Sequence, residues 1–423
     1  MMKQGWTHAL ACSAALAIAG SAQAAALRLQ GSGDPAEIAA YRELVKAFSA
    51  AEPGIEVEFI PVGKQRDHMA KLATSFAAGD PPDLFLINFR RYGQFVSKGV
   101  LEPLGPVLAK RGKYKEADYY EQATEAFRHE GTLMCLPQNV ASLVVFYNVA
   151  VLKMAGLPPP PPDWNWADFK RYAKAMTLDT NGDGKVDIYG FGFERLLIRL
   201  SPLVWQAGGD IVDNLAKPTR LTLDSPGAME AMAYVRSFLT EGSAPPLAES
   251  KSEDYEARFA RGGLGMVLNS RRYVPILRGV PALDWDVAPL PRHKVAATAL
   301  HSDAYCMAKS SPNKEAAYRF LEFATGRVGA GIMARNGRTV PAHKAASLSA
   351  DFLAPDKRPR SSKVFLDVIA TMRRTPNIAS WNEVEARSDA VIEDWYFNTL
   401  KTPQDLGKSM DEATRSLFNA SGK

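Results

Sequence analysis

Residues 136–148 of the 423-residue chain read LPQNVASLVVFYN, and no other stretch is as informative. The second half is an apolar strand that ends in Tyr147 and Asn148. The first half places two polar residues, Gln138 and Asn139, between apolar ones. Buried polar side chains need hydrogen-bond partners, so we expect one of these two residues to face a wet cavity.

The chain before this stretch alternates strands with helices. Residues 26–30 alternate in polarity, and Asp34 can cap a helix in which Pro35 takes the first position. A second strand is expected at residues 55–59, and residues 82–87 predict a short apolar strand of the buried, parallel type. Strands that alternate with helices predict an α/β lobe with a mainly parallel sheet.

A series of motifs along the chain resembles the family 1 extracellular solute-binding proteins of ABC importers. Besides the opening stretch, they are PGIEVEF at 53–59, FAAGDPPDLFLIN at 76–88, WNWADF at 164–169, WQAGGDIVD at 205–213 and GRTVP at 337–341. Each block is weak alone, but their order and spacing cover nearly the whole chain. The resemblance implies a type II, maltose-binding-protein-like α/β fold, in which two lobes joined by a multi-segment hinge close over a solute.

The resemblance also implies how the chain divides. We expect an N-terminal lobe of residues 25–137 and 304–338, and a C-terminal lobe of residues 138–303 and 339–423. Three crossings between the lobes would then lie at the boundaries of these segments. Several crossings restrict motion to a hinge better than one linker does, which suits a protein that must close and reopen.

The first 24 residues predict a secretory signal peptide. Lys3 precedes an apolar run, and Ala22-Gln23-Ala24 fits an A-x-A cleavage site. We expect cleavage near Ala24 and export to the periplasm. No later segment is long and apolar enough for a transmembrane helix. Loss of Lys3 lowers the net charge from +5 to +4, and the absence of a basic run argues against nucleic acid as a partner.

Two cysteines, Cys135 and Cys306, follow the expected cleavage site. An exported protein can join them, but two cysteines are too few for a disulfide scaffold. Two buried free thiols are the simpler interpretation, and the sequence leaves the disulfide open. Both cysteines adjoin expected crossings.

A carbohydrate site needs aromatic platforms for ring faces, together with planar donors and acceptors for hydroxyl groups. In open α/β sheets, ligands bind beyond the carboxyl ends of the strands, which selects loops rather than helices. Trp205 is the candidate stacking platform, and Asp303 is the carboxylate most expected to accept sugar hydroxyls. The candidate ligand-binding residues are Asp34, Asn88, Arg90, Tyr92, Gln138, Asn139, Trp205, Gly209, Asp210, Arg271, Arg272, Tyr273, Ser302, Asp303, Tyr305 and Arg338.

Residues 269–273 depart from the family pattern. Many members carry a glycine and a sugar-stacking tryptophan here, whereas this chain has Arg271, Arg272 and Tyr273. Arginine stacks on a ring face and also forks onto a carboxylate or a phosphate. An anionic solute, such as a uronic acid sugar or a glycerol phosphate, is therefore the alternative to a neutral sugar. A solvent-exposed arginine pair that touches no ligand is the third interpretation.

Residues 179–187 match the first nine positions of an EF-hand-like loop, including the glycine at the sixth. The closing position holds Gly190, so the bidentate glutamate of such loops is absent. No cofactor is required for solute binding, and a structural Ca²⁺ is a candidate. The candidate calcium ligands are Asp179, Asn181, Asp183, Lys185 through its carbonyl, and Asp187.

These features together predict a monomeric periplasmic substrate-binding protein of a carbohydrate ABC transporter. It would capture a sugar or oligosaccharide between its lobes, deliver it to inner-membrane permease subunits and catalyse no reaction.

An exported glycoside hydrolase is the less favoured alternative, and it would need two carboxylates facing each other across a cleft. The chain has no G-x-S-x-G, no H-E-x-x-H and no catalytic Cys-His signature. A polyamine site would need clustered acidic groups, whereas the candidate cleft is rich in arginine. The sequence leaves open which sugar is carried and how long it is.

Overall fold

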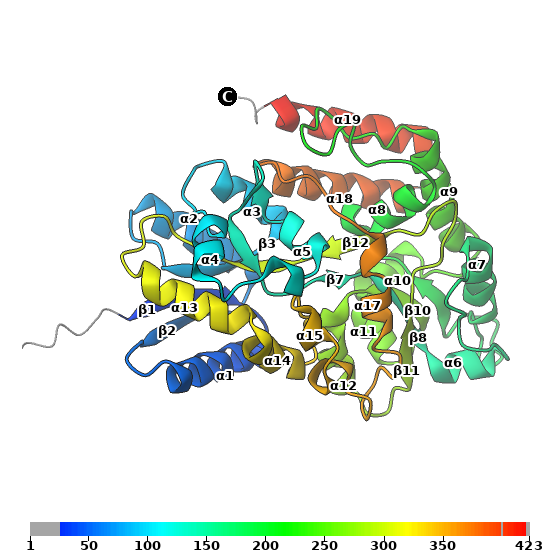
Figure 1. Ribbon diagram of the computed structural model, residues 1–423. Coiled ribbons are helices and arrows are strands. Elements are labelled where there is room, and N and C mark those ends of the chain that lie inside the picture. Colours follow the sequence, from blue (N-terminus) through cyan, green and yellow to red (C-terminus); the bar gives the residue numbers. More distant parts are fainter. Residues whose placement is uncertain (1–25, 399–400, 420–423) are drawn as a thin grey trace, which may run out of the picture.

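The structure is a computed structural model that describes residues 26–398 and 401–419. Two lobes lie side by side, each built around its own β-sheet, with a small third sheet between them (Figure 1). The predicted signal peptide, residues 1–24, lies outside the described residues. In the described part, no helix has the length and apolar character needed to span a bilayer.

The first lobe contains a five-stranded sheet with the order β2-β1-β3-β13-β6. Strand β1 pairs in parallel with β2 and β3, as predicted, whereas β13 pairs antiparallel with β3 and β6 because it returns from the other lobe. The strands are β1 (Leu27–Ser32), β2 (Val57–Val62), β3 (Leu84–Asn88), β6 (Cys135–Pro137) and β13 (Asp303–Met307). The helices of this lobe include α1 (Pro35–Ala51), α2 (Gln65–Ala77), α3 (Phe89–Val96), α13 (Lys314–Thr325) and α14 (Arg327–Arg335).

Helix α1 begins as the sequence predicts. The Asp34 carboxylate accepts the backbone N–H of Glu37 at 2.9 Å, which satisfies one of the free donors of the first turn. Leu44 and Phe48 are fully buried on the face that packs into the lobe. The Glu37 side chain pairs with Arg338 from the far end of the chain, which connects the start of α1 to the last crossing.

The second lobe contains a four-stranded sheet with the order β11-β8-β10-β9. Successive residues of β8 pack into different hydrophobic cores, with Val144 and Phe146 in one and Val145 and Tyr147 in the other. Both faces are covered, so this strand is apolar without alternation. The strands are β8 (Val144–Asn148), β9 (Tyr189–Gly192), β10 (Leu264–Asn269) and β11 (Trp285–Ala288). The helices of this lobe include α7 (Trp166–Ala175), α8 (Leu197–Gln206), α9 (Pro226–Thr240), α18 (Trp381–Phe397) and α19 (Pro403–Asn419).

A three-stranded sheet, β14-β12-β7, lies between the two larger sheets. Its strands are β7 (Ala141–Ser142), β12 (Thr298–His301) and β14 (Met372–Arg373). Strand β7 follows β6 along the chain, and β12 leads through Ser302 into β13. Asn139 forms a β-bridge with Pro341. Three chain segments therefore pass between the lobes next to one another, while the residue boundaries of the lobes stay predictions.

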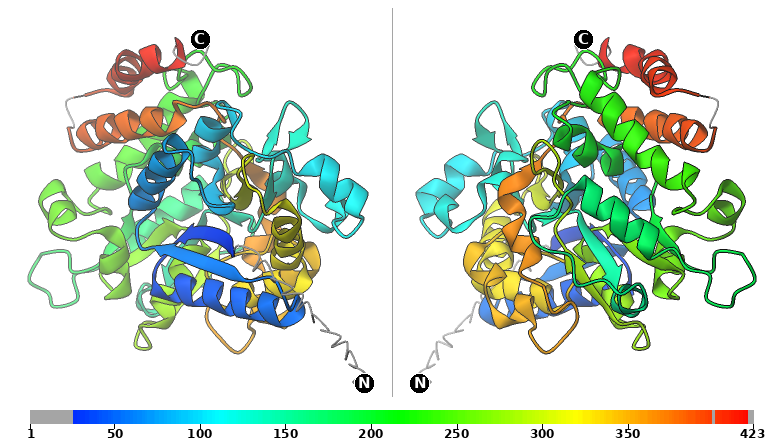
Figure 2. Two further views of the ribbon diagram at one scale, coloured as in Figure 1. Left: turned by 90° about the vertical axis from the view of Figure 1, so that its left-hand side faces the viewer. Right: turned by 90° about the vertical axis from the view of Figure 1, so that its right-hand side faces the viewer.

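Short elements complete the described chain, and the views from the two sides in Figure 2 show helices on the outside of both lobes. The remaining helices are α4 (Gly105–Arg111), α5 (Glu121–Glu125), α6 (Val149–Met154), α10 (Leu247–Ser252), α11 (Tyr255–Ala260), α12 (Val274–Arg278), α15 (Lys344–Ser347), α16 (Ala350–Leu353) and α17 (Val364–Asp367). Strands β4 (Arg128–His129) and β5 (Thr132–Leu133) form a hairpin. The 3₁₀ turns are Glu116–Asp118, Arg271–Tyr273 and Ile369–Thr371.

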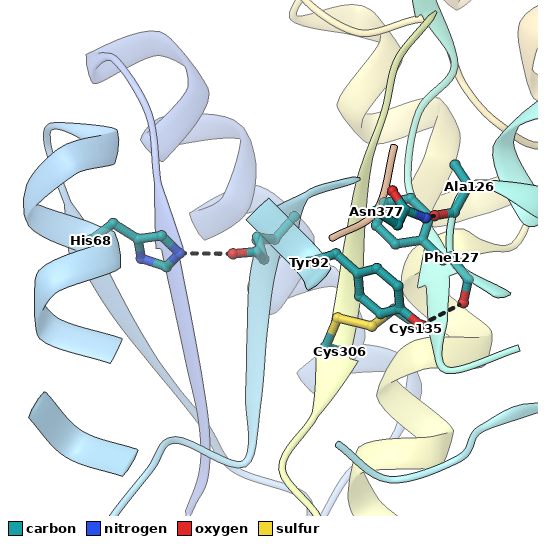
Figure 3. Close-up of a disulfide and its surroundings, with 8 residues drawn as sticks. His68, Tyr92, Ala126, Phe127, Cys135, Cys306 and Asn377 are labelled. Carbon is teal, nitrogen blue, oxygen red and sulfur yellow. Dashed lines mark hydrogen bonds between the residues drawn. A yellow bond between two sulfur atoms is a disulfide. The ribbon is translucent and has the colours of Figure 1, made fainter. Parts of the chain in front are cut away.

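Cys135 and Cys306 form a disulfide between β6 and β13 (Figure 3). The two residues are direct partners in the antiparallel register, so their side chains meet across the ladder. The interpretation of two free thiols is therefore wrong. The bond joins the strand that precedes the first crossing to the strand that follows the second.

Candidate functional site

A polar cavity of about 540 Å³ lies where the two lobes meet the small sheet, and we call it the first cavity. Its walls come from the loops after β1, β2, β3, β9 and β10, from α1, β12, β13 and residues 338–339, and from one face of α18. Most of these are carboxyl ends of strands, where open α/β sheets bind ligands. Tyr41 supplies the one phenyl-type ring among the described lining residues, and that ring is 1% exposed. The predicted residues that line the cavity are Asp34, Asn88, Arg90, Asn139, Arg272, Asp303 and Arg338.

Asp303, at the start of β13, lines the first cavity. Its carboxylate accepts the side-chain N–H groups of Asn88 and Asn139, each at 3.0 Å. Asn88 and Asp303 are register partners at the ends of β3 and β13, which explains how two distant residues meet. Amide donors fix the carboxylate in place and leave acceptor capacity for ligand hydroxyl groups.

Gln138 does not line the cavity but forms hydrogen bonds with residues that do. Its amide nitrogen donates to the hydroxyl oxygens of Tyr41 at 2.9 Å and Tyr305 at 3.0 Å, and its amide oxygen accepts from Asn139 at 3.2 Å. Gln138 and Tyr305 therefore orient the residues that face the cavity without lining it. The expectation that one residue of the pair Gln138 and Asn139 faces a cavity agrees with this arrangement.

Arg338 closes one side of the first cavity. Its guanidinium contacts the carboxylates of Asp34 and Glu37, each at 2.7 Å. Burial raises the pKa of Glu37 to about 7, although the positive charge of Arg338 acts in the opposite direction. A ligand hydroxyl at this end would therefore meet a carboxyl group that can hold a proton near neutral pH.

The second lobe contributes two arginines that are held by carboxylates. Arg199 in the first turn of α8 donates through Nε at 2.6 Å to Glu194, which lies in the loop after β9. Arg272 follows β10 and pairs with Glu256. The strand-end rule that selected residues of the first lobe also selects Glu194, which the sequence-based prediction did not include, whereas Arg199 reaches the cavity from a helix.

Helix α18 forms the remaining wall and contacts both α3 and α8. Asn382, Glu385 and Asp389 share the face that lines the cavity, as their helical spacing requires. Arg90 of the first lobe donates to both carboxylate oxygens of Glu385, at 2.9 and 3.0 Å. Asp389 accepts the N–H of Leu197 at 2.7 Å, and burial raises the pKa of Asp389 to about 7.

His301 lies on β12 at the back of the first cavity. Burial, followed by the charges of Arg90, Arg199 and Arg272, lowers the pKa of His301 well below the ordinary value of histidine. The imidazole is therefore neutral at pH 7. No local pattern around His301 points to a role in binding, because its surroundings depend on three arginines that lie far apart in the chain.

Three of the predicted ligand-binding residues donate hydrogen bonds to backbone carbonyls of the protein itself. Tyr92 is buried, and its hydroxyl donates to the carbonyl of Phe127 at 3.3 Å (Figure 3). The hydroxyl of Ser302 donates to the carbonyl of Asn139 at 2.6 Å, and the hydroxyl of Tyr273 donates to a backbone carbonyl. These three side chains satisfy the backbone around the site and do not line the cavity.

Arg271 lies outside the cavity although its neighbour Arg272 lines it. The Arg271 guanidinium donates to the carbonyls of Gly337 at 3.1 Å and Phe352 at 2.8 Å, and stacks 4.0 Å from the Phe352 ring centroid. Burial lowers the pKa of Arg271 to about 9. Successive residues after a strand point in different directions, so only one of the adjacent arginines reaches the solute site.

A second cavity, of about 430 Å³, holds the predicted residues Trp205 and Asp210. The guanidinium of Arg373 lies 5.2 Å from the Trp205 ring centroid and pairs with the carboxylate of Asp210. Gly209 packs against the start of α9, where an added Cβ would lie 3.1 Å from the backbone nitrogen of Ala228. Trp205, Gly209 and Asp210 therefore do not line the first cavity.

The candidate calcium loop is exposed and already well bonded. Asp179 accepts the N–H groups of Gly182 at 2.7 Å and Gly184 at 2.8 Å, and Asp187 accepts from Thr180 at 2.7 Å. Within the described residues no group of three or more His, Cys, Asp or Glu side chains could hold a metal ion. The loop is folded by its own hydrogen bonds, and calcium binding at Asp179, Asn181, Asp183, Lys185 and Asp187 stays a prediction.

The family model described as bacterial extracellular solute-binding protein matches residues 32–330. The chain belongs to this family. A Brucella abortus protein described as a binding protein is 27% identical over 382 residues, which cover 87% of this chain and 88% of that protein. The arabinooligosaccharide-binding protein of Bacillus subtilis is 25% identical over 68% of this chain and 66% of its own length.

Solved structures share the fold. An ABC substrate-binding protein from Listeria monocytogenes, in complex with cycloalternan, superposes with a TM-score of 0.81 at 25% identity and covers 92% of this chain and 98% of that chain. The predicted two-lobed, maltose-binding-protein-like α/β fold is confirmed. The family and these structural neighbours are binding proteins.

Proposed function

We propose that this chain is the substrate-binding protein of a carbohydrate ABC importer, exported to the periplasm after cleavage near Ala24. The observation that carries the proposal is the first cavity, because its walls come from both lobes and from the strands between them. A solute held there contacts both lobes at once and so favours the closed arrangement over the open one. An inner-membrane permease would recognise the closed form.

The chemistry of the first cavity suits a hydroxyl-rich solute. Asp303, Asn88 and Asn139 form a fixed acceptor-donor cluster on one wall, and ion pairs such as Arg90 with Glu385 supply further donors and acceptors on the other. Sugar hydroxyl groups both donate and accept, so they can satisfy such a surface, whereas an apolar solute would leave it unpaired.

The proposed role requires neither catalysis nor a cofactor, and a single copy of the chain supplies both walls. Several carboxylates line the cavity, but Glu385, Glu37 and Asp34 are each paired with an arginine. Such pairing suits ligand positioning rather than the free acid and base that glycoside hydrolysis uses. Absence of product after prolonged incubation with oligosaccharides is the expected result for a pure sample.

Calorimetric titration of residues 25–423 with neutral mono- and oligosaccharides and sugar acids tests the proposal. We expect saturable binding with a micromolar or lower Kd for at least one sugar, and loss of most of that affinity in Asp303→Ala. Asp80→Ala, at an exposed surface pair with Arg28, is the matched control and is expected to bind like the wild type. Binding of no carbohydrate of any class would contradict the proposed function.

A further inference from the structure

Two buried nitrogens of residues that line the first cavity have no hydrogen-bond partner. Among the described residues that line it, Nη1 of Arg199 and Nε2 of His301 are the buried side-chain atoms without a hydrogen-bond partner. A buried donor without a partner costs free energy, so natural sites keep such groups where a ligand completes them. Arg199 is 4% exposed, which makes its free Nη1 a costly group to leave unpaired.

Three arginines lie around these two atoms, each paired with a carboxylate. The Arg199 guanidinium uses Nε to hold Glu194 at 2.6 Å and presents Nη1 without a partner. His301 lies within electrostatic reach of Arg90, Arg199 and Arg272. Arg90 and Arg272 are paired with Glu385 and Glu256, yet both still line the cavity.

The cavity is therefore asymmetric. The wall around Asp303 gathers a carboxylate and two amides that suit hydroxyl groups. The end around His301 gathers donors that suit oxygen atoms with negative charge, because arginine forks onto carboxylate and phosphate. No phenyl or indole face is open for stacking among the described lining residues, so a neutral sugar ring would gain little there.

We propose that Arg199, His301 and Arg272 form a subsite for the anionic group of the solute, a carboxylate or a phosphate carried on a hydroxyl-rich body. This inference rests on the proposed function and narrows it to acidic sugars and polyol phosphates. In the complex, the anionic group accepts from Nη1 of Arg199 and from Nε2 of His301. The hydroxyl groups at the other end of the solute contact Asp303 and its two amide partners.

Glu194 is the residue that competes with the anion for Arg199. It lines the same cavity, and its carboxylate accepts the Nε–H of Arg199 at 2.6 Å. Replacing it with glutamine removes a negative charge next to the subsite. This substitution is therefore expected to strengthen anion binding, whereas removing a donor weakens it.

The test is calorimetric titration of residues 25–423 with matched pairs that differ in charge: D-glucuronate against D-glucose, and glycerol 3-phosphate against glycerol. We expect at least one anion to bind about tenfold or more tightly than its neutral partner. His301→Gln is expected to lower that anion's affinity about tenfold, and Glu194→Gln to raise it severalfold. Arg373→Gln removes a charge in the second cavity and is expected to leave the affinity unchanged.

The two pairs of anionic and neutral solutes distinguish a sugar acid from a polyol phosphate. Preferential binding of either anion supports the subsite. Thermal melting establishes that each variant folds, and Glu194→Gln tests the subsite through a gain of affinity even where His301→Gln unfolds the protein. Neutral sugars that bind while the anions do not, or anion affinities that stay constant in both variants, would overturn the subsite and leave the proposed function standing. Failure of every neutral and anionic solute would overturn both.

Discussion

The two cavities between the lobes lie beside the same strand but are built differently. Neighbouring residues of β12 line them, His301 the first and Leu300 the second. In the first, the side chains of Arg90 and Glu385 are 19% and 10% exposed. In the second, the pair of Arg373 with Asp210 is 44% and 58% exposed. Charges shielded from water interact more strongly, so a polar solute gains more in the first cavity.

This difference also shows why an aromatic residue is a weak guide to the solute site. Trp205 has the side chain expected of a stacking platform, yet it is 1% exposed and its ring is covered by Arg373 in the second cavity. The first cavity depends on arginines, carboxylates and amides, and its one phenolic ring is that of buried Tyr41. The account therefore predicts that substitutions in the two cavities have different effects.

The largest effect is expected from breaking the ion pair between the lobes. Glu385→Ala leaves Arg90 without its carboxylate in a mostly buried place, and should lower the free energy of unfolding by about 3 kcal/mol. Asp210→Ala breaks the exposed pair of the second cavity and should cost less than about 1 kcal/mol. Urea denaturation of both variants measures the difference. Equal losses would show that the two cavities do not differ in this way.

The next effect concerns affinity. Asp303→Ala removes the acceptor that Asn88 and Asn139 hold in place, and should weaken solute binding about a hundredfold. Trp205→Phe should leave the Kd within a factor of two, because Trp205 lines the second cavity and not the first. Titration calorimetry with the best ligand measures both. A large loss in Trp205→Phe would move the solute to the second cavity.

A smaller effect is expected in the pH dependence of stability. Burial raises the pKa of Asp389 to about 7, so the folded state holds more protons than the unfolded state below that pH. The free energy of unfolding should therefore fall as pH rises, by about 2 kcal/mol between pH 5 and pH 7 for this one group. Asp389→Asn should remove the contribution of Asp389 to this fall in the free energy of unfolding. The contribution of Glu37, whose pKa is also raised to about 7, should remain.

Asp213 in the second cavity provides the matched control for the pH experiment. Burial would raise the pKa of Asp213, but the hydrogen bonds from Thr219 and Arg220 outweigh it and lower the pKa. Its contribution to stability is therefore lost only as the pH falls below the ordinary range of aspartate. Thermal melts of Asp213→Asn should keep the wild-type slope between pH 5 and pH 7. An unchanged slope in Asp389→Asn would contradict the account.

The smallest effect is expected from chelation. The carboxylates of Asp179 and Asp187 already accept donors within the loop, so EDTA should change Tm by about 1 °C or less. Differential scanning calorimetry with and without Ca²⁺ measures this shift. A fall of several degrees on adding EDTA would establish the calcium site that the loop sequence predicts.

Much of the fold could be predicted from the sequence because its signals are local. The cap at Asp34, the apolar run of β8 and the alternation of strands with helices each depend on neighbouring residues. The disulfide could not be predicted, because pairing of Cys135 with Cys306 depends on the register of two strands that lie far apart in the chain.

The site was harder to predict than the fold. The strand-end rule found Asp34 and Asn88, and it would also have found Glu194 had it been applied to β9, but not Arg199, which lies on α8. The face of α18 and His301 carry no such signal, since a helix face and a hinge strand become part of the cavity only through tertiary packing. Arg271 is an example of the opposite error. It was predicted to bind the solute, but its buried guanidinium donates to backbone carbonyls of the protein.

A crystal structure of residues 25–423 with the tightest-binding solute would locate the solute site. We predict density for the solute in the first cavity, with its hydroxyl groups on Asp303 and contacts to both lobes. Density stacked on Trp205 in the second cavity, with the first cavity filled by water alone, would contradict this prediction.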